Sequence, residues 1–135
     1  ATITGVSGTG SVGTVTASGT GGVTIAGTYT VTVQSYYGAN KYYLNGSLQL
    51  TVNLSEGSTY RFDQSDSSNS GHPLRFSTTS GGTHSGGSQY TTGVTTNGTP
   101  GSAGAYTQIT VASGAPTLYY YCTNHSGMGG QANTP

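Results

Sequence analysis

The stretch Leu118-Tyr119-Tyr120-Tyr121-Cys122-Thr123-Asn124-His125-Ser126-Gly127-Met128 joins a strand pattern to a set of candidate metal ligands. Its first five residues are rich in aromatic side chains, which favour β-strands. Successive strand residues face opposite sides, so Cys122 shares one face with Leu118 and Tyr120. Cys122, His125 and Met128 follow the spacing Cys-x2-His-x2-Met. The stretch therefore predicts a strand that points Cys122 into the protein, followed by a loop with two further ligands.

A second histidine with inward parity lies fifty residues upstream, in Gly71-His72-Pro73-Leu74. His72 is in step with Leu74 and Phe76, so all three side chains are expected on the buried face of one strand. Apolar neighbours would shield a bound metal from water. A thiolate, two imidazoles and a thioether form the soft ligand set that suits copper. We expect a mononuclear copper site formed by His72, Cys122, His125 and Met128.

The same residues also have an interpretation without a metal. Cys122 would then be a buried, unreactive thiol, and Met128 would fill a gap in the core. His125 would be exposed, and His72 would pack beside Pro73 as a structural histidine. The protein would be a metal-free structural β-sandwich. His84 lies in a glycine-rich loop and is expected at the surface, with a stray surface metal ligand as the alternative.

The remaining sequence predicts an all-β protein. Glycine recurs too often for a helix of useful length, and apolar residues alternate with polar ones rather than at helical spacing. Short strands separated by turn residues are typical of a β-sandwich or barrel. Besides 118–122, strands are expected at 48–54, 58–63, 72–76, 90–94 and 106–111, with a turn at Glu56-Gly57.

Residues 1–34 form a Gly/Thr-rich stretch that we separate from a main domain at 35–135. Its short alternating pieces predict a β-hairpin arm or a small extra sheet. The alternative is an arm that completes its sheet against a neighbouring subunit, since its few apolar side chains cannot build a core alone. That alternative implies a homo-oligomer or a larger surface assembly. The start at Ala1 leaves open a processed form or a piece of a longer protein.

Composition excludes several classes of function. Three basic and three acidic residues balance to zero net charge, so nucleic acid is not expected as a partner. No apolar run approaches the ~18 residues of a membrane span. No Ser-His-Asp set, carboxylate pair or phosphate loop is recognisable, so an enzyme is not expected. Richness in Gly, Ser, Thr and Tyr is typical of extracellular or virion-surface β proteins.

The chain resembles the cupredoxins, the family of type 1 blue copper proteins. The resemblance spans roughly residues 40–130 and rests on segment 48–54, Glu56-Gly57 before Tyr60-Arg61-Phe62, His72 after a loop, and segment 121–128. The Cys-x2-His-x2-Met spacing is similar to the short ligand loop of amicyanin, whereas plastocyanins have a longer interval. Asn-His-Ser-x-Met is also similar to the binuclear copper domain of cytochrome oxidase, but that centre needs two bridging cysteines and this chain has one.

This resemblance implies a cupredoxin-like Greek-key β-sandwich with an N-terminal Gly/Thr-rich arm. It also implies that His72, Cys122 and His125 lie near a trigonal plane, with Met128 as a long axial ligand. Zinc could substitute for copper on the same ligands. Thr123 and Asn69 are expected to contact the ligands and orient them without binding the metal themselves.

Two classes of function follow from this expected site. The favoured one is a copper-binding module in a surface assembly, such as a virion decoration or fibre protein or an extracellular structural protein. There the metal would stabilise the fold and could also be redox-active. Segment 62–77 and the Tyr-Tyr-Tyr-Cys run are similar to modules in structural proteins of marine bacteriophages. The alternative is a soluble type 1 copper electron-transfer protein, although few charges are present to steer a partner.

Pro73 gives the first testable prediction. Blue copper proteins often have asparagine after the first histidine, and its backbone N–H donates to the cysteine sulfur. Proline has no N–H, so the thiolate here is expected to be more electron-rich. Substituting Pro73→Asn in the copper-loaded protein should raise the reduction potential, as measured by voltammetry. An unchanged potential would contradict this reasoning.

Overall fold

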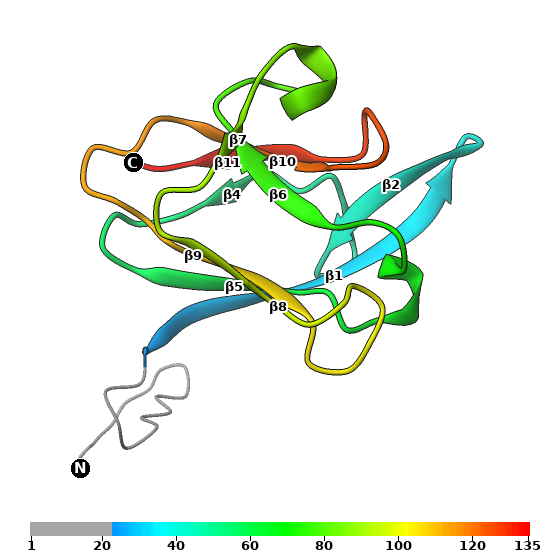
Figure 1. The fold of residues 1–135 in the computed structure, drawn as a ribbon, viewed down its shortest axis with the longest axis horizontal. Helices are drawn as coiled ribbons and strands as arrows, with labels where there is room; N and C mark the ends of the chain where they lie inside the picture. The colour runs from blue at the N-terminus through cyan, green and yellow to red at the C-terminus, as the bar shows by residue number, and fades with distance from the viewer. Residues whose placement is uncertain (1–22) are drawn as a thin grey trace.

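The structure is a computed structural model that describes residues 23–135, which form two β-sheets packed face to face (Figure 1). The all-β prediction is confirmed. Only two short 3-10 helices occur in the described range, η1 (Ser67–Asn69) and η2 (Gly82–Ser85). No helix within 23–135 is long and apolar enough to cross a membrane.

Both sheets are mixed, with one parallel pair of strands in each. The six-stranded sheet has the order β3 (Ser47–Leu48), β2 (Ala39–Leu44), β1 (Ile25–Tyr36), β5 (Thr59–Asp63), β9 (Tyr106–Thr110) and β8 (Val94–Asn97). The five-stranded sheet has the order β4 (Val52–Asn53), β11 (Gly130–Asn133), β10 (Leu118–Cys122), β6 (Leu74–Ser77) and β7 (Gln89–Tyr90).

The core is built from the inner faces of the two sheets and depends on large aromatic side chains. Phe62 of β5 lies 5.3 Å from Phe76 of β6 and 6.3 Å from Tyr120 of β10, measured between ring centroids. Tyr29 stacks on Phe62 at 5.1 Å. The contacts of Phe62 with Phe76 and Tyr120 cross from one sheet to the other, whereas Tyr29 and Phe62 lie on neighbouring strands of one sheet. The aromatic residues thus supply much of the surface that a chain poor in aliphatic residues can bury.

Strand β1 places part of the expected arm inside the sandwich. Ile25–Thr30 pairs in parallel with β5, and Val31–Tyr36 pairs with β2 in antiparallel fashion. The expected boundary between 34 and 35 therefore falls within one strand. The alternating Val, Tyr and Thr residues belong to a core strand, and Val31 is fully buried. The rest of the expected arm, residues 1–22, lies outside the described residues.

Two expected strands are each split between the sheets. Segment 48–54 contains the end of β3 and all of β4, and segment 90–94 contains the end of β7 and the start of β8. Each segment crosses from one sheet to the other, with positive φ at Gln49 (44°) and at Gly93 (71°). A residue that faces the interior from one sheet can still face it from the other. Alternation therefore persists across the crossing and does not reveal the break.

Candidate metal centre

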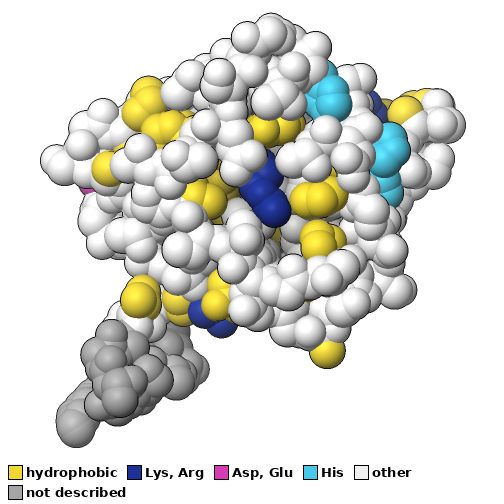
Figure 2. Space-filling model, viewed as in Figure 1, with side chains coloured by type: hydrophobic (Ala, Val, Ile, Leu, Met, Phe, Trp, Pro, Cys, Tyr) yellow, Lys and Arg dark blue, Asp and Glu magenta, His cyan; other side chains and the backbone are white. Residues whose placement is uncertain are grey.

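Three predicted ligands converge at one end of the sandwich. The sulfur of Cys122 lies 3.7 Å from Nδ1 of His72 and 3.6 Å from Nδ1 of His125. The candidate ligand atoms of the three residues all lie within 4.8 Å of one another. The predicted convergence of His72 with Cys122 and His125 is therefore confirmed. Figure 2 shows histidine side chains along one edge of the molecule.

Strand pairing explains why residues fifty positions apart meet. In the antiparallel pair β6–β10, Cys122 lies opposite Leu74 and Tyr120 opposite Phe76. Residues that lie opposite each other point to the same side of a sheet. His72 precedes Leu74 by two residues, and its side chain is likewise buried. The pairing therefore brings His72 beside Cys122, as the parity of the sequence predicted.

Two of the candidate ligands, His72 and Cys122, are shielded from water. Cys122 is fully buried and His72 is 9% exposed, whereas His125 is exposed. Burial, and then the neighbouring His125, lowers the pKa of His72 from its ordinary value. The imidazole is therefore neutral at neutral pH, with a nitrogen lone pair free to bind a metal.

The backbone of His72 is fixed by buried side chains. Its carbonyl accepts hydrogen bonds from the Tyr42 hydroxyl at 2.6 Å and from Gln64 Nε2 at 2.7 Å. Gln64 Oε1 in turn accepts from the Leu74 amide at 2.9 Å. The Gln64 side chain therefore spans Pro73, which has no N–H of its own to donate. Burial, above all, raises the pKa of Tyr42, so its hydroxyl stays protonated and donates.

Asn69 extends this network to the opposite sheet. It is fully buried, and its Oδ1 accepts from Gln64 Nε2 at 3.0 Å. Its Nδ2 donates to the Val31 carbonyl at 2.7 Å, and its carbonyl accepts from the His72 amide at 2.8 Å. Asn69 thus supports His72 through hydrogen bonds. The sequence offered no signal for Gln64 or Tyr42, because a polar loop residue is ordinarily exposed and nothing sets Tyr42 apart from the other strand tyrosines.

Met128 lies in the core at 1% exposure, at the end of the loop that carries His125. Its carbonyl accepts from the Tyr42 amide at 2.9 Å. Tyr42 thus connects the two segments: its backbone amide binds Met128 and its hydroxyl binds His72. The role of the Met128 thioether as a fourth ligand stays a prediction.

His84 is exposed, as expected, but it contacts the site from outside. Its Nε2 lies 2.8 Å from the Cys122 carbonyl, and its ring meets Tyr121 edge-on at 6.3 Å. Gly82 of η2 rests on the Tyr121 ring, where an added Cβ would lie 2.5 Å from the ring carbons. This close approach holds His84 against the strand end. His84 is absent from the group of ligand atoms that meet at Cys122.

Comparison of the chain with protein-family models, curated proteins and solved structures gave no match. The chemistry of the site is therefore argued from the atoms of this chain. Those atoms are one buried thiol and two imidazoles, on one strand end and two loops.

The buried Gln64 amide gives the second prediction. Gln64→Leu keeps a similar volume but leaves the Leu74 amide and part of the His72 carbonyl without a partner. Leaving such buried groups unpaired typically costs about 1–3 kcal/mol, which urea denaturation of the metal-free protein would measure.

The matched control is Gln34→Leu, because Gln34 is an exposed strand residue whose amide contacts only Thr32 Oγ1 at 3.3 Å. Its free energy of unfolding should change by less than about 0.5 kcal/mol. Equal effects of the two substitutions would contradict the assigned role of Gln64.

Proposed function

We propose that this protein is a cupredoxin-like module that binds one copper ion. His72, Cys122 and His125 would be the principal ligands, and Met128 would be the fourth. The observation that carries the proposal is the position of two imidazole nitrogens 3.6 and 3.7 Å from one buried thiol sulfur.

These distances fit ligands that share an ion. With a metal–sulfur bond of ~2.3 Å and a metal–nitrogen bond of ~2.0 Å, angles of ~110–120° place sulfur and nitrogen roughly 3.5–3.7 Å apart. Two such separations around one sulfur support a metal site over a thiol that merely fills space. The metal-free structural β-sandwich is the interpretation that would stand if the copper titration described below failed.

The donor set favours copper over other metals. Thiolate and imidazole suit both copper and zinc, and the added soft thioether favours copper. Zinc on the same three residues is the substitute we expect when copper is absent. Bound copper would supply one-electron redox chemistry, and binding of either metal would add to the stability of the fold.

We further propose that the module belongs to a surface assembly, extracellular or on a virion, and that it is neither an enzyme nor a nucleic-acid-binding protein. Scarcity of charge supports this, since the chain has three basic and three acidic residues, and Figure 2 shows Lys and Arg in small separate patches. An electron carrier usually presents a charged or apolar docking patch, and this chain has little charge to steer a partner. The exposed imidazole of His125 favours the second candidate, a soluble electron-transfer protein, because it brings a ligand to the surface.

Copper titration tests the site. Adding copper(II) to the full chain should produce a strong thiolate-to-copper absorption band at about 600 nm, with one ion bound per chain. Cys122→Ser should abolish the band because the thiolate is its source. His84→Ala is the matched histidine control and should keep the band. A wild-type protein that stays colourless, and that also fails to bind zinc in calorimetry, would refute the metal site.

The size of the native particle separates the two candidate functions. A trimer or larger assembly in gel filtration of the full chain is expected for the surface module. A monomer with reversible copper redox cycling would instead support the electron carrier.

A further inference from the structure

Hydrogen bonds from β2 and from the residue after β3 hold the end of the ligand loop. Their acceptors are three consecutive carbonyls, those of Gly127, Met128 and Gly129. Lys41 Nζ donates to Gly127 at 2.8 Å, and the Tyr42 amide donates to Met128 at 2.9 Å. The third donor to this segment is the side-chain amide described next.

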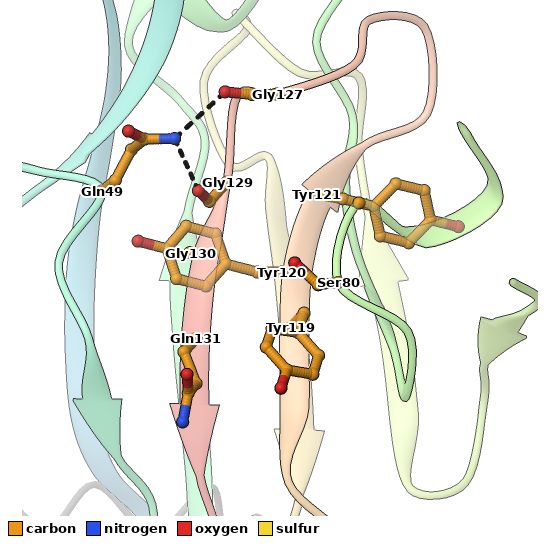
Figure 3. A pocket seen from close by; sticks show the side chains of 10 residues that line it. Gln49, Ser80, Tyr119, Tyr120, Tyr121, Gly127, Gly129, Gly130 and Gln131 are labelled. Carbon is orange, nitrogen blue, oxygen red and sulfur yellow. Dashed lines mark hydrogen bonds between the residues drawn. The ribbon is translucent and has the colours of Figure 1, made fainter. Parts of the chain in front are cut away.

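Gln49 brackets Met128 with a single amide group. Its Nε2 donates to the Gly127 carbonyl at 3.0 Å and to the Gly129 carbonyl at 2.7 Å, as the dashed lines in Figure 3 show. These acceptors lie directly before and after Met128 in the chain. Both N–H groups of the amide can therefore be used on the two sides of one candidate ligand.

The backbone of Gln49 is in a conformation that side-chain-bearing residues rarely adopt. Its φ is 44°, in the left-handed region where glycine is favoured. The backbone N–H of Gln49 donates to the Tyr42 carbonyl at 2.9 Å, and this hydrogen bond holds the conformation in place. Such strain persists where the surroundings impose it, and it often marks a functional position.

The other side of the ligand loop is equally constrained. A Cβ added at Gly129 would collide with the Tyr120 carbonyl, and one at Gly130 would lie 2.8 Å from the Gln49 carbonyl. The loop end is thus pressed between β10 and Gln49. A groove of about 330 Å³ lined by Gln49, Gly127 and Gly129 opens on this side (Figure 3). Without the Gln49 amide, these carbonyls would lie beside an open groove.

We infer that Gln49 is a positioning residue for the metal site, which holds Met128 in a fixed place relative to His72, Cys122 and His125. This inference rests on the proposed function, because it assigns the bracketed thioether to the copper ion. Loss of the bracket would weaken the thioether as a donor. Copper(II) would lose more than copper(I), since the higher charge gains more from each donor, and the reduction potential would rise.

The test uses Gln49→Gly, which removes the bracket and suits the positive φ, so folding is not at risk from backbone strain. In the metal-free protein, the Tyr42 amide should exchange with solvent about tenfold faster, because the Met128 carbonyl that it binds is held less firmly. In the copper-loaded protein, the potential should rise, in the same direction as in Met128→Leu.

A double variant decides whether Gln49 acts through Met128. Adding Gln49→Gly to Met128→Leu should cause no further shift in potential, since the ligand that Gln49 positions is already gone. The control is Gln131→Ala, which removes an amide that lines the same groove but donates to Asn133 Oδ1 at 2.7 Å. It should leave both the potential and the Tyr42 exchange rate unchanged.

The outcomes distinguish this inference from the proposed function. A wild-type protein with no thiolate-to-copper band would overturn the proposed function and, with it, the role of Gln49. A wild-type band together with an unchanged potential in Gln49→Gly would overturn the role of Gln49 alone. Additive shifts in the double variant would also overturn it, because Gln49 would then act by another route.

Discussion

The antiparallel pairing of β6 with β10 is the constraint on which the candidate site depends. It places Cys122 opposite Leu74 and so brings the residue two positions before Leu74 beside the sulfur. A shift of the register by one residue would turn Cys122 to the outer face of the sheet. The pairing cannot continue in the ordinary way at Pro73, which lacks an N–H. Gln64 compensates by bonding the groups on both sides of the proline from within the core.

Much of this arrangement could be predicted from the sequence because short strands have a fixed period of two. Parity was enough to place His72 and Cys122 on buried faces, and three residues from Cys122 to His125 are few enough for a turn to bring the second imidazole back. Parity failed at 48–54 and 90–94, where alternation continues while the chain changes sheet. Alternation also did not predict β11, because Ala132 is the only fully buried side chain of Gly130–Asn133.

The supporting residues could not be predicted, and the reason is physical. Gln64 and Gln49 each contact the site region through a backbone carbonyl. Every residue has such a carbonyl, so the sequence does not show which carbonyl a given side chain will bind. Ligand atoms are different, since only a few residue types supply sulfur or imidazole nitrogen. Sequence therefore reveals the atoms that would touch a metal long before it reveals what holds them.

The span of the site bears on the choice between a stabilising and an electron-transferring metal. His72 and Cys122 are separated by fifty positions. A metal clip that closes a long loop removes more freedom from the unfolded chain than one that closes a short loop. With only 31% hydrophobic residues, this chain would gain much from such a clip. Zinc would stabilise the fold in the same way, whereas electron transfer requires a metal that changes oxidation state. The two candidate functions share every ligand, but only electron transfer requires a redox-active metal, so a site that holds zinc would leave the stabilising function alone.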